Sequence, residues 1–209
     1  GNEIATHSDL HQLAYQQNRK AFAEDLKRSI ESLEGISGRK IRAYRAPGFS
    51  LMESNKWVFS ELITQGIEID CSIFPAKRSH GGFANFGQQE PCWVDVDGHK
   101  LKEFPINVTS MAGLPVIFSG GGYFRLLPDA ILAKLWDQQR YVMTYFHPRD
   151  FDAGQPMIQD LSMIRKFKSY YGLAGALSKL ERLMRGREFI DLVEADQQIN
   201  WEKARTVYL

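Results

Sequence analysis

Amphipathic helical segments alternate with short apolar strands between residues 13 and 70, and this alternation restricts the fold more than any other pattern in the sequence. Residues 13–33 predict a helix with one apolar stripe, made by Ala21, Phe22, Leu26, Ile30 and Leu33. Residues 41–44 predict a buried strand, residues 54–66 a helix capped by Ser54, and residues 67–70 a second strand. Such alternation favours parallel strands wrapped by helices, so we expect an α/β fold.

The later sequence predicts further strands and helices of the same kind. Residues 93–101 indicate a hairpin that turns at Asp97-Gly98, and residues 103–107 indicate another strand. A helix is expected from Pro128 to Gln139, a strand over residues 141–146, a basic helix over residues 161–183 and a closing strand over residues 189–193. The three glycines at 120–122 match neither a phosphate loop nor a dinucleotide motif, so a tight turn is expected there.

Composition excludes several classes of partner. The 209 residues are 44% hydrophobic, enough for one core, and we expect a single domain over residues 1–209. The 26 basic residues nearly balance the 25 acidic ones, so the chain is not expected to have the positive electrostatic potential that binds nucleic acid. No apolar run reaches the roughly 20 residues of a membrane span, and no signal segment opens the chain, which favours a cytoplasmic location. The sequence does not indicate an oligomeric state. Cys71 and Cys92 are expected to be free thiols.

Two histidines four positions apart, His7 and His11, predict a metal site. On one helical turn, this spacing directs both imidazoles at a single divalent ion. A catalytic ion usually takes three protein ligands and a water, and a carboxylate is a common third ligand. The alternative is a pair of surface or capping histidines at the start of a helix.

Arg45 and His147 each follow a predicted buried strand, at the edge where parallel α/β folds assemble their sites. A guanidinium in the Arg45-Ala46-Pro47-Gly48 turn could orient an acidic catalytic group through a forked hydrogen bond. An imidazole at 147 is a candidate general acid. The alternatives are a surface arginine and a buried structural histidine.

Taken in order, these motifs resemble the polysaccharide deacetylases of the NodB homology domain, carbohydrate esterase family 4. That family has a His-Ser/Thr-x-x-His motif, an Arg-x-Pro turn with a nearby glycine, and a late histidine after a strand, which match His7 to His11, Arg45 to Gly48, and His147. Residues 69–75, 120–125 and 146–148 resemble the branch associated with bacterial exopolysaccharide and exosortase loci.

The resemblance implies a distorted (β/α) barrel that removes N-acetyl groups from a polysaccharide or glycan intermediate. His7 and His11 would bind a divalent metal, with zinc the expected ion, Arg45 would orient the catalytic carboxylate, and His147 would protonate the departing amine. The same resemblance implies substrate contacts for Pro47, Gly48, Asp70, Tyr123 and Arg125. From the residues alone, Asp70 could equally well end a strand.

One departure from the family concerns its Asp-Asp motif, which supplies the general base and the third metal ligand. No Asp-Asp pair occurs in this sequence. We therefore expect a barrel without its first strand, first helix and second strand, and a chain that could be inactive in this form. Two alternative functions stay open: a non-catalytic glycan-binding or assembly module with the same fold, and an amidohydrolase acting on a small N-acyl substrate.

Overall fold

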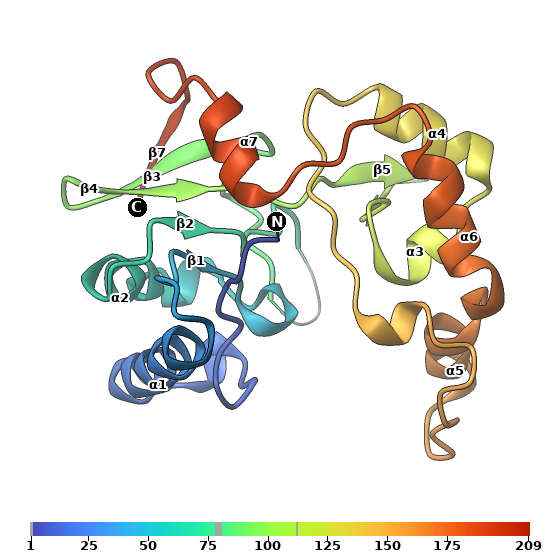
Figure 1. Ribbon diagram of the computed structural model, residues 1–209, viewed down its shortest axis with the longest axis horizontal. Coiled ribbons are helices and arrows are strands. Elements are labelled where there is room, and N and C mark those ends of the chain that lie inside the picture. The colour runs from blue at the N-terminus through green and yellow to red at the C-terminus, as the bar shows by residue number, and fades with distance from the viewer. Residues whose placement is uncertain (1, 78–80, 112) are drawn as a thin grey trace. The chain divides into compact units, whose positions relative to one another are not determined.

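In the computed structural model of the chain, residues 2–77, 81–111 and 113–209 are described. The chain forms two compact units, residues 1–106 with 190–209 and residues 107–189, and each is described by itself. A single domain over residues 1–209 stays a prediction. Both units belong to a mixed α/β chain (Figure 1).

The described residues of the first unit form three α-helices, α1 (Arg19–Ser37), α2 (Trp57–Thr64) and α7 (Leu192–Gln198). Helix α1 starts where the Asn18 side chain accepts a hydrogen bond from the Ala21 N–H, and it ends at Gly38 in the left-handed conformation. The predicted first helix therefore begins and ends later than expected, after a 3-10 turn at Ala14–Gln16. Ser54 lies in a 3-10 turn, Glu53–Asn55, and does not cap α2.

Five strands form one sheet in the first unit, in the order β1-β2-β4-β3-β7 (Figure 1). Their bounds are β1 (Ala43–Tyr44), β2 (Ile69–Asp70), β3 (Cys92–Val96), β4 (His99–Glu103) and β7 (Thr206–Tyr208). Strands β1, β2 and β4 are parallel, β3 and β4 are antiparallel, and β7 is parallel to β3. Their carboxyl ends therefore bring Tyr44, Asp70 and Glu103 to one edge of the sheet.

The predicted hairpin is confirmed, but two predicted strands are wrong. Strands β3 and β4 turn at Asp97 and Gly98, which both have positive φ, as a tight hairpin requires. Strand β4 ends at Glu103, and Pro105 has no N–H with which to continue the ladder. The chain enters α7 where a closing strand was expected, because the Asp191 side chain caps that helix, and β7 lies at the end of the sheet instead.

The sheet is open within the described residues. Its two outer strands, β1 and β7, are not paired with each other, and only an isolated parallel bridge joins Thr6 to Tyr44 beyond β1. The structure thus has a mixed α/β fold, and the closure of the expected barrel is not observed.

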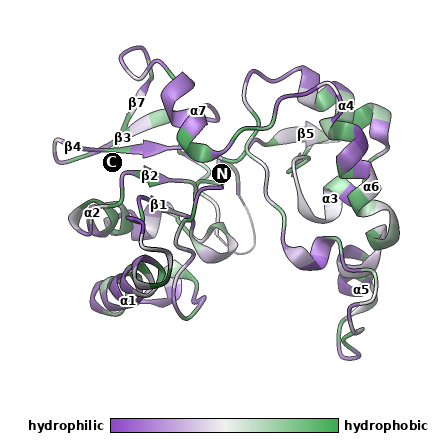
Figure 2. Cartoon of the chain, in the orientation of Figure 1, coloured by the Kyte–Doolittle hydropathy of each residue, from purple (hydrophilic) through white to green (hydrophobic). Residues whose placement is uncertain are grey.

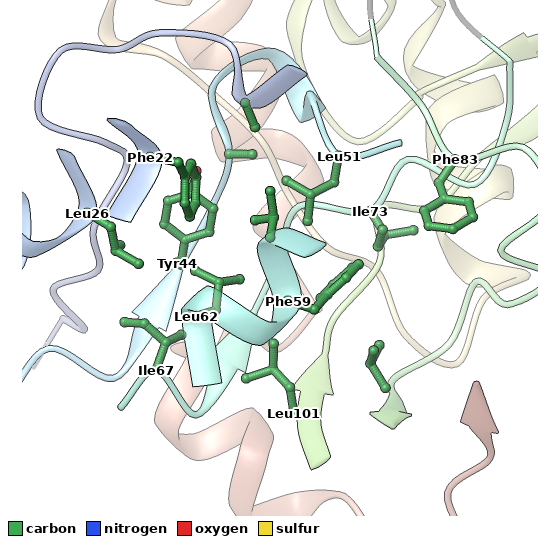
Figure 3. Close-up of a cluster of buried hydrophobic side chains, with 14 of the residues drawn as sticks. Phe22, Leu26, Tyr44, Leu51, Phe59, Leu62, Ile67, Ile73, Phe83 and Leu101 are labelled. Carbon is green, nitrogen blue, oxygen red and sulfur yellow. The ribbon is translucent and has the colours of Figure 1, made fainter. Parts of the chain in front are cut away.

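The core of the first unit lies between α1, α2 and one face of the sheet (Figure 3). Phe22 and Leu26 come from α1, Phe59 and Leu62 from α2, and Leu101 from β4. The hydropathy colouring separates the hydrophobic and hydrophilic residues of α1 (Figure 2).

Alternate residues of β3 and β4 point to the face of the sheet opposite α1 and α2. The Trp93 ring lies 5.0 Å from the Trp201 ring, and the Lys102 ammonium contacts Asp196 of α7 at 2.6 Å. Helices α1 and α2 therefore cover one face of the sheet, and α7 with the segment after it covers the other.

Within its described residues, the second unit contains a short hairpin and four α-helices. The hairpin pairs β5 (Thr109–Met111) with β6 (Leu114–Val116). The helices are α3 (Gly121–Leu126), α4 (Asp129–Asp137), α5 (Met163–Tyr170) and α6 (Leu173–Met184). Their core is made by Phe118, Phe124, Leu132, Trp136 and Leu183.

The structure confirms one predicted helix in this unit as α4 and corrects two other elements. The expected strand over residues 141–146 is only an isolated bridge between Tyr145 and Gly120. The expected helix over residues 161–183 is broken into α5 and α6, because Gly172 has a φ of 74°. No helix in the described part of the chain is long and apolar enough to cross a membrane.

Candidate functional site

His7 and His11 lie together at the carboxyl edge of the sheet, but not on a helix. The Thr6 N–H donates to the Ala43 carbonyl at 2.9 Å, which places His7 directly beyond the end of a strand-like segment. Residues 7–13 form an irregular loop in which Ser8 and His11 have φ of 72° and 55°. The predicted helical turn is therefore wrong, yet the two ring centroids are only 5.0 Å apart.

The tautomer of His7 follows from its contact with Arg45. His7 Nδ1 lies 2.6 Å from the Arg45 carbonyl oxygen. Because a carbonyl oxygen only accepts, Nδ1 carries the proton and donates it in this bond. In the neutral ring Nε2 is then the unprotonated nitrogen, which is the nitrogen that can bind a metal.

A buried carboxylate on α1 holds the loop between the two histidines. Asp25 is 2% exposed, and its two oxygens accept hydrogen bonds from the Asp9 N–H at 3.1 Å and the Leu10 N–H at 2.9 Å. Arg28, one turn further along α1, donates to the Asp9 carboxylate at 3.0 Å. These contacts hold the backbone between His7 and His11 in place. Residues 7–11 alone would not do so.

Arg45 follows β1 and enters the 3-10 turn Pro47–Phe49. Its Nε donates to the Cys71 carbonyl at 3.3 Å, and its guanidinium lies 5.9 Å from the centroid of the Phe49 ring. Pro47 is buried, whereas Gly48 is exposed with a φ of 62°. This turn thus carries Arg45 on a rigid backbone beside the histidine pair.

Asp70, at the end of β2, is fully buried and supports the Arg45 turn. The Ser72 hydroxyl donates to Asp70 Oδ1 at 2.5 Å, and the same Ser72 oxygen accepts from the Ala46 N–H at 2.7 Å. The predicted contact between Asp70 and substrate stays a prediction, while the structure gives this carboxyl a positioning role.

Glu103 lies directly opposite Asp70 in the register of β2 and β4, and it is also fully buried. Asp70 Oδ2 and Glu103 Oε2 are buried, and neither has a hydrogen-bond donor among the described residues unless one carboxyl donates to the other. Two carboxyl groups can form such a bond only if one is protonated. Burial first, and then the charge of Asp70, holds the pKa of Glu103 well above its usual range, so the pair keeps a proton.

In the second unit, His147 is held by an ion pair beneath it. Its N–H donates to Asp150 Oδ2 at 3.0 Å, and its Nδ1 lies 3.6 Å from the same oxygen. The buried guanidinium of Arg125 pairs with Asp150. Burial alone would raise the pKa of Asp150, but the bonds from His147 and the charge of Arg125 outweigh it and leave that pKa below its ordinary value.

The remaining predicted residues of this unit differ in exposure. Tyr123 on α3 is 39% exposed, whereas Arg125 is 5% exposed. Arg125 also donates to the carbonyls of Lys168, Ser169 and Tyr171 at the end of α5. Its predicted contact with substrate stays a prediction, and the structure shows it binding its own chain.

The structure thus groups His7, His11 and Arg45 with Pro47, Gly48 and Asp70 in the first unit, and His147 with Tyr123 and Arg125 in the second. A single site that contains both groups stays a prediction.

The donor set fits a divalent metal in part. No group of three or more His, Cys, Asp or Glu side chains could hold an ion in the part of the chain that the structure describes. Two imidazoles bound to one tetrahedral ion would place their ring centroids about 5 Å apart, given nitrogen–zinc bonds of about 2 Å. The observed separation of 5.0 Å matches this value. Ser8 Oγ, between the two histidines, is buried with no partner among the described residues, so a further polar group would satisfy it.

Three positioning residues were missed from the sequence, although each has a recognisable signal. Asp25 interrupts the apolar face of α1 between Phe22 and Leu26. Glu103 follows Leu101 at the strand period of two, which places a charge on the buried face. Asp150 lies three residues after His147, the spacing of a local capping pair.

Comparisons with known proteins agree with this fold. The sequence model of the family described as Domain of unknown function (DUF3473) matches residues 71–197. That range includes His147 but not the histidine pair or Arg45. No curated protein sequence matches the chain.

Two solved structures are similar in fold. One is described as a "putative polysaccharide deacetylase" from Mycobacterium smegmatis; it has 20% identity and a TM-score of 0.61, over 100% of this chain and 66% of that one. The other is a 4-alpha-glucanotransferase from Thermococcus litoralis, with 14% identity and a TM-score of 0.56, over 99% of this chain and 30% of that one. The chain therefore spans less than two thirds of either protein, and at these identities the similarity concerns the fold alone.

Proposed function

This chain belongs to the family described as Domain of unknown function (DUF3473), and we propose that it is a metal-dependent hydrolase that removes N-acetyl groups from a glycan. The observation that carries the proposal is the histidine pair at the carboxyl edge of the sheet, where the Arg45 carbonyl fixes His7 in the tautomer that binds metals. The fold shared with a protein described as a polysaccharide deacetylase supports the choice of reaction.

His7 and His11 would hold the metal, and zinc is the ion we propose. When bound, such an ion supplies Lewis-acid chemistry, since it polarises an amide carbonyl and lowers the pKa of a bound water. Arg45 would orient an acidic group next to that pair through its guanidinium. The carboxylate that would accept the water's proton belongs to an Asp-Asp motif that this sequence does not contain.

His147 would protonate the departing amine. Its side chain is half-exposed, and Asp150 holds its backbone N–H and lies beside Nδ1. These contacts hold the imidazole that would donate the proton. Arg125 keeps Asp150 charged and in place, so both residues act through His147. Tyr123, Pro47 and Gly48 are proposed substrate contacts.

The substrate that we propose is an N-acetylated polysaccharide or glycan intermediate of bacterial exopolysaccharide or cell-envelope metabolism. The resemblance of three sequence strings to the exopolysaccharide-associated branch supports this choice. A cytoplasmic location stays a prediction.

The direct test is acetate release from an N-acetylglucosamine oligomer by the zinc-supplemented chain. We expect a rate that His147→Ala lowers by about 10²- to 10⁴-fold, the usual contribution of a positioned acid. His99→Ala is the matched control, because His99 is an exposed histidine on the β4 hairpin. Equal rates for the two variants would remove His147 from the mechanism.

A second function is a glycan-binding or assembly module with the same fold, which would bind an N-acetylated glycan and not hydrolyse it. It is favoured by the finding that, among the described residues, no group of three or more His, Cys, Asp or Glu side chains could hold a metal ion. Isothermal titration with the same oligomer separates the two functions: binding with no acetate release supports a glycan-binding or assembly module, and release excludes it.

A further inference from the structure

Helix α5 in the second unit carries an apolar face that contributes nothing to a core. None of its residues is buried. Met163, Ile164 and Phe167 are 81%, 70% and 49% exposed, and their spacing places them on one side of the helix. Met157 and Ile158, in the segment before the helix, are also more than half exposed. Contiguous exposure of this kind marks an interaction surface.

The rest of α5 carries three cations, Arg165, Lys166 and Lys168, and the two lysines lie at the borders of the apolar face. Residues 161–180 contain no Asp or Glu. Among the described residues, none of these three cations forms an ion pair with a carboxylate. By contrast, Arg182 and Arg187 on and after α6 pair with Asp129 and Asp137. The charge of α5 is therefore available to an anionic partner.

The helix is fixed to its own unit at its C-terminal end. Arg125 donates to the carbonyls of Lys168 and Tyr171 at 2.8 and 3.0 Å. The Tyr170 hydroxyl donates to the Pro156 carbonyl at 3.0 Å and accepts from the Ile158 N–H at 2.8 Å, so the apolar segment before α5 is tied to its last turn. The helix thus presents one preformed face and does not need to fold on binding.

We propose that this face docks on an anionic lipid surface, with Met163, Ile164 and Phe167 in the acyl-chain boundary and the cations at the headgroups. An apolar stripe flanked by lysines is the pattern of interfacial helices, whose lysine stems reach outward to the headgroups. A protein receptor that encloses a basic amphipathic helix contacts most of the circumference of the helix. A flat bilayer contacts only one side of it. Because α5 is pinned to its unit, the bilayer is the better fit. The inference is independent of the proposed deacetylation.

Vesicle flotation of the whole chain tests this proposal. We expect binding to vesicles of phosphatidylcholine with phosphatidylglycerol and little binding to phosphatidylcholine alone. Lys166→Gln with Lys168→Gln should weaken partitioning by roughly fivefold for each lysine removed. Lys20→Gln with Lys27→Gln, at exposed positions on α1, is the control of equal charge change and should leave binding unchanged.

The apolar contribution has its own pair of variants. Met163→Gln with Ile164→Gln should lower partitioning by about tenfold or more, while Ile36→Gln, at a residue 84% exposed on α1, should not. Unchanged circular dichroism shows that each variant is folded. Absence of binding to the anionic vesicles, or equal binding by the α5 variants and their controls, overturns the proposal. A dimer that Met163→Gln with Ile164→Gln abolishes, without vesicle binding, overturns it in favour of a second copy.

Discussion

Asp25 is the residue that makes the histidine pair possible. The backbone at Ser8 and His11 adopts positive φ, which side chains other than glycine adopt at a cost, so the loop needs outside support. The carboxylate of Asp25 supplies it by accepting two backbone N–H groups of the loop. The pair is thus held by a residue 14 to 18 positions away, which no local pattern specifies.

We expect Asp25→Ala to weaken zinc binding by about 10- to 100-fold, the usual effect of losing a group that orients metal ligands. Two N–H groups would lose their acceptor, and the loop would no longer hold the two rings together. Competition with a chromophoric chelator measures the change. Glu24→Ala, at the exposed neighbouring position on α1, is the control, and equal affinities for the two variants would refute the role given to Asp25.

The Asp70 and Glu103 pair makes stability depend on pH. Because the pKa of Glu103 in the folded chain lies well above its usual value of 4.5, the folded state binds more protons than the unfolded state above that pH. Stability contributed by this group is therefore present at lower pH and is lost as the pH rises toward the raised pKa.

Glu103→Gln removes this titration and keeps an amide that can donate to Asp70. We expect the free energy of unfolding in urea to fall less between about pH 5 and 8 in this variant than in the wild-type chain. Glu202→Gln, at an exposed carboxyl, should follow the wild-type curve. A wild-type curve that rises over the same interval, with Glu103→Gln flat, would contradict the sign of the shift.

At the scale of elements, the break between α5 and α6 depends on Gly172. Its φ of 74° is favourable only for glycine, and an added Cβ would lie 3.1 Å from Arg125 Cβ and 3.2 Å from the Arg125 carbonyl oxygen. The residue therefore sets both the direction of α5 and its attachment to Arg125.

Gly172→Ala should lower the free energy of unfolding by about 1 kcal/mol or more. Gly175→Ala is the matched control, since Gly175 lies inside α6 with open space around its Cα, and there alanine should add about 0.5–1 kcal/mol. Urea unfolding of both variants measures the difference. A Gly172→Ala chain as stable as the wild type would show that the break tolerates an ordinary side chain.

The elements that the sequence predicts well are those set by local interactions. The main helix, the Asp97-Gly98 hairpin and α4 were expected because periodicity and turn residues encode them within a few positions. The errors involve partners distant in sequence. Strand β7 pairs with β3 across more than 100 residues, and the loop of His7 and His11 depends on α1. The 161–183 segment was predicted as one helix because the periodicity continues through Gly172, whereas contacts with Arg125 decide the break.

At the scale of the whole molecule, the proposed site residues lie in two units, and their meeting in one site stays a prediction. The histidine pair could be chosen from its spacing and Arg45 from its place after a predicted strand, whereas the resemblance to the deacetylase family indicated Asp70. Asp25 and Glu103 support residues distant in sequence, so their sequence signals mark a charge on a buried face but not its partner, whereas Asp150 supports His147 three positions away. The proposed function depends on a bound metal. The roles proposed for Arg45 and His147 are both steps of metal-dependent hydrolysis.

Zinc content of the purified chain, measured by mass spectrometry for the wild type and for the double variant His7→Ala with His11→Ala, tests that dependence directly. We expect the wild-type chain to retain zinc and the double variant to lose it. His99→Ala should retain as much zinc as the wild type. Full zinc occupancy in the double variant would show that the histidine pair is not the metal site and would contradict the proposed function.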